Sequence, residues 1–218
     1  WNLSCTASST SCTGNTDDTI NYSCNFPLWF IADPTVSGTP FDTQSWSAGV
    51  AGVDDDNATG TMATTSSPVE LLSLVAIDLL TSTIAYDQLE PGTNMPNLTS
   101  SSSLRVLGNT GLNQLLGGES MCTTFSNSSL CPVSATSTIP QNQQRYATSS
   151  VTYASGSALP ATTSPATLLI QIPKPTSTST PTAGTTYWGI AVPGTISLAG
   201  SYTGQNTFTG AISTPAAW

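Results

Sequence analysis

The chain has 218 residues, of which 38% are hydrophobic and only 7% are charged, and 12 acidic residues against 3 basic ones give a net charge of −9. Binding to nucleic acid is excluded and binding to an anionic membrane surface is disfavoured, because both need clustered lysine and arginine. No apolar run reaches the ~18 residues of a membrane-spanning helix, and no charged, apolar leader precedes Trp1, so we expect any signal peptide to lie outside this numbering.

Residues 1–68 are predicted to form a small immunoglobulin-like β-sandwich. Large and polar side chains alternate over residues 20–26, an apolar run follows at 27–31, and alternation returns at 46–50. Residues 1–20 hold few apolar side chains that could anchor them to a core. Two interpretations of them stay open: a terminus held by disulfide bonds, or a segment that lies across the next subunit.

Residues 67–86 carry conflicting signals. Ser67, Pro68 and Glu70 have the spacing of a helix start. The run ends, however, in Thr81, Ser82, Thr83 and Ile84, which suit strands. Because every other segment is typical of β-structure, we predict a strand that leads into a second domain.

The second predicted domain spans residues 69–218 and is a larger β-sandwich. Short alternating segments are separated by Gly, Pro and Asn turns, which is typical of sandwiches. Inward-facing sets include Trp188, Ile190 and Val192, then Leu168, Ile170 and Ile172, and last Tyr202, Phe208 and Ile212. The predicted strands are at 83–93, 103–116, 145–155, 166–173, 187–192 and 201–212. The fold class is therefore predicted as all-β, with two consecutive Ig-like β-sandwich domains.

The 5 cysteines and the absence of histidine favour disulfide bonds over a zinc site or Cys/His catalysis. Cys122 and Cys131 are predicted to close a short loop. Among the first three cysteines we favour a Cys5–Cys24 pair, which leaves Cys12 free or bonded between chains. Disulfides indicate an oxidising compartment, so we expect a secreted, extracellular or cell-surface protein.

Sugars are the second modification that the sequence predicts. About a third of the residues are Ser or Thr, and residues 173–186 are typical of an extended, O-glycosylated loop. Five sites fit the Asn-x-Ser/Thr pattern of N-glycosylation, namely Asn2, Asn21, Asn57, Asn97 and Asn127.

No catalytic constellation is visible, and we do not expect an enzyme. Glu70, Glu90 and Glu119 form no paired-carboxylate pattern and are interpreted as solvated. Without histidine, a serine nucleophile would need Lys174, which lies between two prolines. No cofactor is expected except Ca²⁺, whose candidate ligands are Asp54, Asp55 and Asp56; the alternative for these three residues is a solvated turn.

Three segments carry a resemblance to a known family: "STIAYDQLEPGT", "VLGNTGLNQLLGGESMC" and "YWGIAVPGTISLAGSYTGQNTFTG". Together they resemble a β-sandwich module of secreted surface proteins from small-genome, Patescibacteria-type bacteria. The preceding "WSAGVAGVDDDNATGT" resembles the end of an immunoglobulin- or PKD-like module. The resemblance implies an extracellular structural or adhesive role and no catalytic residues.

The leading functional hypothesis is a structural subunit of an extracellular filament, pilus or sheath that polymerises with copies of itself. Low charge, a Ser/Thr-rich surface and many strand edges favour assembly by strand exchange or sandwich packing. The alternative is a cell-surface adhesin, a glycoprotein that binds host glycan or protein through end loops. Exposed aromatic residues in loops would favour the adhesin, but Trp29, Trp46 and Trp188 lie in strand patterns and are expected in the core, while Trp1 and Trp218 are candidate inter-subunit anchors.

Overall fold

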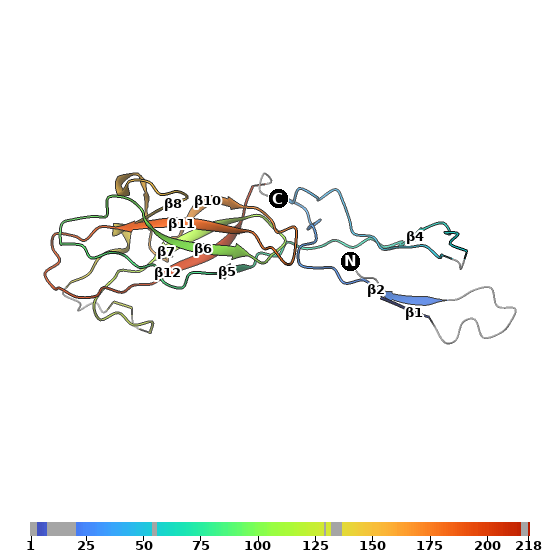
Figure 1. The fold of residues 1–218 in the computed structure, drawn as a ribbon, viewed down its shortest axis with the longest axis horizontal. Coiled ribbons are helices and arrows are strands. Elements are labelled where there is room, and N and C mark those ends of the chain that lie inside the picture. The colour runs from blue at the N-terminus through green and yellow to red at the C-terminus, as the bar shows by residue number, and fades with distance from the viewer. Residues whose placement is uncertain (1–3, 8–20, 54–55, 129, 132–136, 215–217) are drawn as a thin grey trace. The chain divides into compact units, whose positions relative to one another are not determined.

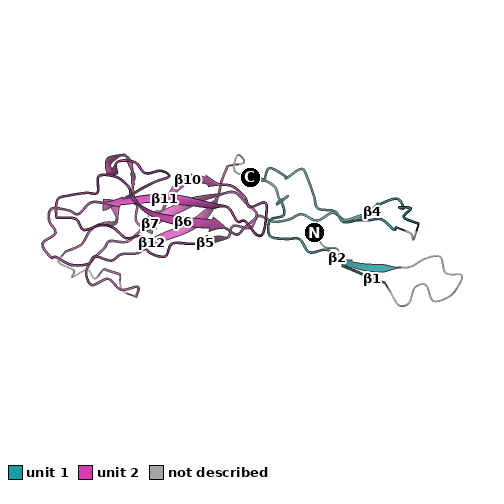
Figure 2. Cartoon of the chain, viewed as in Figure 1, with its two compact units in different colours: residues 1–72 teal, residues 73–218 magenta. Residues whose placement is uncertain are grey.

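The structure is a computed structural model that describes residues 4–7, 21–53, 56–128, 130–131, 137–214 and 218. It divides into two compact units, Trp1–Leu72 and Ser73–Trp218, and each is described by itself (Figure 2). The division falls after Leu72, whereas the sequence placed it after residue 68. Only strands, turns and two short 3₁₀ helices occur among the described residues, which confirms the all-β class.

The first unit contains two separate antiparallel ribbons in its described part (Figure 1). β1 (Ser4–Ala7) pairs with β2 (Tyr22–Asn25), and β3 (Gly49–Val50) pairs with β4 (Ala63–Thr64). No two sheets pack face to face there, so the predicted N-terminal sandwich is not found in the residues described. The physical reason is the lack of a core, because Ala32 and Pro34 are the only buried apolar residues described in this unit, and both are small.

Two aromatic residues of the first unit differ in their environment. Residues 26–29 are not in a strand, and Trp29 is 48% exposed, so its prediction as a core residue is wrong. Trp46 is half-buried: its backbone pairs with Val69, and its indole Nε1 donates to the carbonyl of Asp33 (2.8 Å). Without a second sheet to cover it, the apolar run at 27–31 cannot become a buried strand.

The second unit is a two-layer β-structure in which all strand pairs of the sheets are antiparallel (Figure 1). One sheet has five strands in the order β5-β6-β11-β8-β9, and the other has three in the order β10-β7-β12. The five strands are β5 (Ile77–Leu79), β6 (Ser100–Val106), β11 (Ala183–Ile190), β8 (Gln144–Ala147) and β9 (Ser157–Ala158). The three strands are β10 (Ala166–Ile172), β7 (Leu112–Gly118) and β12 (Asn206–Ile212). Short 3₁₀ helices lie at Gln141–Gln143 and Tyr153–Ser155.

The core lies between the two sheets. Trp188 on β11 is fully buried. The centroid of its ring lies 5.7 Å from the ring centroid of Tyr146 and 5.8 Å from that of Phe208. Leu168, Ile170 and Ile172 alternate inward along β10, as predicted. Ile212 was predicted inward but is 49% exposed, because β12 is an edge strand and ends at this residue.

The ambiguous run at residues 67–86 contains a strand and no helix. β5 pairs with β6, with Ile77 opposite Val106. A Cβ on Gly210 of β12 would lie 2.9 Å from Val75 Cγ1 and 3.0 Å from Ile77 Cγ2, so this run packs closely against β12. Contacts distant in sequence therefore override the helix-start signal.

Residues 83–93 depart from the strand that the sequence predicts. They follow β5 but belong to no strand. The turn at their end is as predicted: the Thr93 amide donates to the Glu90 carbonyl (3.1 Å), and Gly92 has φ +82°, a conformation that favours glycine.

Candidate functional site

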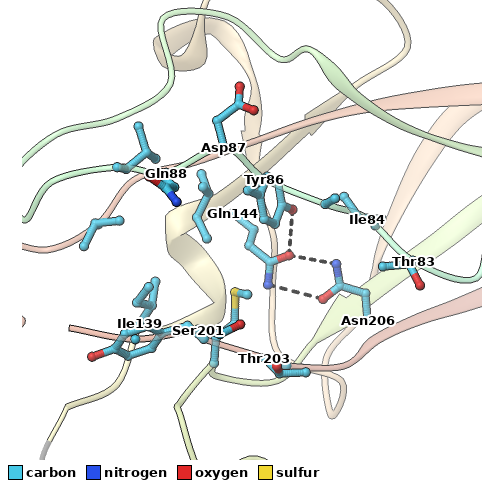
Figure 3. A pocket seen from close by; sticks show the side chains of 18 of the residues that line it. Thr83, Ile84, Tyr86, Asp87, Gln88, Ile139, Gln144, Ser201, Thr203 and Asn206 are labelled. Carbon is cyan, nitrogen blue, oxygen red and sulfur yellow. Dashed lines mark hydrogen bonds between the residues drawn. The ribbon is translucent and has the colours of Figure 1, made fainter. Parts of the chain in front are cut away.

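An open pocket of about 1080 Å³ lies in the second unit, between residues 79–91 on one side and residues 196–208 on the other (Figure 3). We call it the edge groove. Its apolar lining includes Ile139 and Ile190 of a buried core cluster and Met121, which packs against that cluster, and Ser, Thr, Asn and Gln side chains line the rest. Of the described residues that line it, Asp87 alone is charged.

A polar network lies within the lining of the edge groove (Figure 3). The Tyr86 hydroxyl donates to Gln144 Oε1 (2.9 Å), which also accepts from Asn206 Nδ2 (2.8 Å), while Gln144 Nε2 donates to Asn206 Oδ1 (3.3 Å). These three residues join residues 79–91 to β8 and to β12. The network therefore fixes the distance between the two walls of the groove at this point.

Both walls of the edge groove present unpaired backbone. β12 pairs with β7 alone among the described strands, so its other edge is free of a strand neighbour. On the opposite wall, the Leu80 amide donates to the Ser103 carbonyl (2.9 Å), and the Ala85 carbonyl accepts from Ser100 Oγ (2.5 Å). No backbone amide or carbonyl of residues 82–84 or 86–89 has a hydrogen-bond partner within the described part of the chain.

An apolar floor between two unpaired edges suits one kind of ligand. An extended peptide can donate and accept backbone hydrogen bonds along an open edge, while every second side chain enters the apolar floor. Small polar substrates gain little from such a site, because backbone edges offer no fixed charge. The edge groove is therefore suited to bind a strand.

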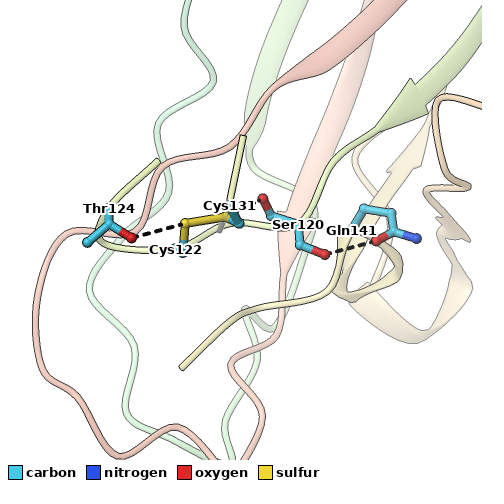
Figure 4. Close-up of a disulfide and its surroundings, with 5 residues drawn as sticks. All are labelled: Ser120, Cys122, Thr124, Cys131 and Gln141. Carbon is cyan, nitrogen blue, oxygen red and sulfur yellow. Dashed lines mark hydrogen bonds between the residues drawn. A yellow bond between two sulfur atoms is a disulfide. The ribbon is translucent and has the colours of Figure 1, made fainter. Parts of the chain in front are cut away.

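The Cys122–Cys131 disulfide lies next to the groove (Figure 4). Cys122 follows Met121, which lines the groove, and its backbone exchanges two 3.0 Å hydrogen bonds with Thr203, another lining residue. Nearby, the Ser120 hydroxyl donates to Gln141 Oε1 (3.2 Å). The disulfide thus fastens the loop after residue 122 to the strand pairing at one end of the groove.

Both predicted disulfides are present in the structure. Cys5 is bonded to Cys24 with a Cα–Cα distance of 4.0 Å, and Cys122 to Cys131 with 5.8 Å. Cys12 lies outside the described residues. The Cys5–Cys24 disulfide links β1 to β2, where these two residues are directly opposite each other.

The described candidate glycosylation sites are open to solvent. Asn21, Asn57, Asn97 and Asn127 are all exposed, and Asn2 lies outside the described residues. None of these four exposed asparagines lines the edge groove. No sugar at these four positions would be attached to a residue of the groove lining.

The carboxylates form no cluster in the described residues. Asp54 and Asp55 lie outside them, and Asp56 is exposed, so the Ca²⁺ hypothesis stays a prediction. Glu70 and Glu90 are exposed, and the Glu119 carboxylate accepts a hydrogen bond from the Thr162 hydroxyl. No group of three or more His, Cys, Asp or Glu that could hold a metal ion occurs among the residues the structure describes.

Burial makes Tyr86 a titratable probe of the groove. Burial, and to a lesser degree the charge of Tyr153, raises the pKa of the Tyr86 phenol above its ordinary value. The folded state therefore favours the neutral phenol. Its contribution to stability is complete below about pH 10, the ordinary pKa of tyrosine, and is lost as the pH rises through the raised value.

We expect the free energy of unfolding to fall above about pH 10 and Tyr86→Phe to reduce this fall. Denaturant titrations from pH 7 to 12 would measure both effects. Tyr187→Phe is the matched control, at a tyrosine on β11 outside the groove lining. An equal alkaline loss in the wild type and in Tyr86→Phe would contradict the burial of this phenol.

Within the described residues, no helix is long and apolar enough to cross a membrane. Comparison with known proteins identifies no relative: no family model matches the chain, and no curated protein or solved structure matches it either.

Proposed function

We propose that this protein is a structural subunit of an extracellular filament, pilus or sheath, and that its copies assemble by adding a strand of one to the edge groove of another. The observation that carries the proposal is the groove itself, an apolar floor between two unpaired edges. An open edge of this kind is a ready site for pairing with another chain.

The first unit supports the same proposal. Among its described residues only Ala32 and Pro34 are buried apolar side chains, while large side chains such as Val53, Met62 and Leu72 are more than half exposed. Isolated two-stranded ribbons are marginally stable in water, so this unit gains stability from a partner surface. Two disulfides fit an oxidising, extracellular setting.

Contact between different surfaces of identical subunits leads to open, helical polymers or to rings. The test is to concentrate the purified full chain and to follow its size by sedimentation and its shape by electron microscopy. Regular fibres that grow above a critical concentration would support the proposal. A monomer at high concentration, with no fibres in the native secreted material, would overturn it and leave the adhesin for a glycan array to test.

A further inference from the structure

The β1–β2 ribbon has one apolar and one polar face. The register places Cys5 opposite Cys24 and Ala7 opposite Tyr22, so these four side chains share a face. The other face holds only polar residues: Ser4, Thr6, Ser23 and Asn25. A ribbon with this pattern is built to lie with one face on an apolar surface.

The apolar face of the ribbon has no core beneath it. Tyr22 is 58% exposed, and Phe26, the next large residue at the same spacing, is 39% exposed. Side chains of this size are usually buried when they lie on the inner face of a strand. The ribbon also has two outer edges without strand neighbours, because β1 and β2 pair only with each other in the described chain.

The ribbon and the edge groove are complementary. β1 and β2 carry no charged residue, and the described groove lining holds one, Asp87, so docking would bury little charge. Both surfaces offer unpaired backbone and aromatic or aliphatic side chains. Asn21 precedes Tyr22 and falls on the polar face by alternation, so a sugar there would point away from the groove.

On the basis of the proposed function, we propose that the donor, the segment that one copy adds to the edge groove of another, is the β1–β2 ribbon. Docking then places Tyr22 and Phe26 on the floor of the groove. An outer edge of the ribbon then pairs with an unpaired edge of the groove. The Cys5–Cys24 disulfide holds the two donor strands in register before docking, which reduces the entropy lost on binding. Donor and acceptor belong to different units, so the contact joins two different surfaces and is head-to-tail, the kind that builds open polymers or rings.

The test uses two pairs of full-length variants that add the same charge at exposed positions. In the donor pair, Tyr22→Asp alters the apolar face and Asn25→Asp the polar face of the same strand. In the acceptor pair, Leu198→Asp alters the groove at a residue that is 47% exposed, and Leu169→Asp alters β10 at one that is 64% exposed and outside the groove. Circular dichroism would verify that all four fold.

Tyr22→Asp and Leu198→Asp are each expected to raise the critical concentration for polymerisation at least about tenfold, which corresponds to 1.4 kcal/mol per contact. The two control variants should polymerise like the wild type. A mixture of Tyr22→Asp and Leu198→Asp should stop at a 1:1 dimer, because one chain keeps an intact groove and the other an intact ribbon. Sedimentation velocity would resolve monomer, dimer and polymer.

Three other outcomes would contradict either the ribbon as donor or the proposed function. Normal polymers from Tyr22→Asp with none from Leu198→Asp would overturn the ribbon as donor and leave the proposed function standing. Equal losses in Tyr22→Asp and Asn25→Asp would also overturn it, because the two faces would then not differ. A wild type that never polymerises would instead refute the proposed function itself.

Discussion

Replacing Trp188 by alanine is expected to lower the free energy of unfolding of the second unit by about 3–5 kcal/mol, the usual cost of deleting a buried aromatic side chain. Trp188 is fully buried and contacts Tyr146 and Phe208. Its indole Nε1 also donates to Ser102 Oγ (2.9 Å), and Ser102 is itself buried. The substitution leaves both a cavity between the sheets and an unsatisfied hydroxyl.

Thermal unfolding of the full chain, followed by circular dichroism, would measure this loss as a fall in Tm of about 10–15 °C. Trp188→Phe keeps an aromatic ring in the core, so its loss should be smaller. Trp29→Ala is the matched control, since Trp29 is 48% exposed and belongs to the first unit. If Trp188→Ala and Trp29→Ala unfold at the same temperature, Trp188 is not the centre of the core.

The alternation of side chains was enough to predict the core around Trp188. The two sheets of the second unit enclose its core, so a period of two in the sequence becomes one buried face. The same pattern failed at Trp29, because the first unit has no second sheet to pack against it. Local alternation predicts which face could be buried, whereas the presence of a covering layer depends on the rest of the fold.

The burial of polar side chains at the centre of β7 could not be predicted for a related reason. Asn113 and Gln114 are both buried, and the Gln114 Oε1 accepts from the Thr186 hydroxyl (2.8 Å), which is buried as well. Amide side chains are mostly found at surfaces, so no local pattern predicts that these two are buried. Gln114 depends on a hydrogen-bond partner 72 residues away, and Asn113 on the Gln171 amide, 58 residues away, which donates to its Oδ1 (3.0 Å).

The edge groove had only an indirect signal in the sequence. Strand exchange was a hypothesis from composition, with residues 1–20 as the segment that reaches a neighbour. The acceptor could not be located, since residues 83–93 were interpreted as an ordinary strand. The unpaired backbone of residues 82–84 and 86–89 becomes visible only in the folded unit, where residues 79–91 and β12 line the same pocket. Of the predicted donor segment, residues 1–3 and 8–20 lie outside the described part of the chain, residues 4–7 form β1, and β2 follows the segment.

The two disulfides are expected to have separable effects on stability and on assembly. Cys122→Ser with Cys131→Ser opens a loop whose ends are 9 residues apart. Loss of this cross-link should lower the free energy of unfolding of the second unit by about 2–3 kcal/mol, because the unfolded chain regains the entropy of the open loop. The corresponding fall in Tm is about 5–10 °C. The pairing between Cys122 and Thr203 should loosen as well, which weakens the groove as an acceptor.

Cys5→Ser with Cys24→Ser is the matched control variant, since its cross-link lies in the first unit. It should leave the thermal unfolding of the second unit unchanged and raise only the critical concentration for assembly, because the donor ribbon loses its fixed register. Circular dichroism would measure the thermal unfolding of the second unit, and sedimentation would measure the critical concentration for assembly. If both double variants shift Tm equally, the units do not unfold independently; if neither shifts it, the Cys122–Cys131 loop contributes nothing to the cooperative fold around the groove.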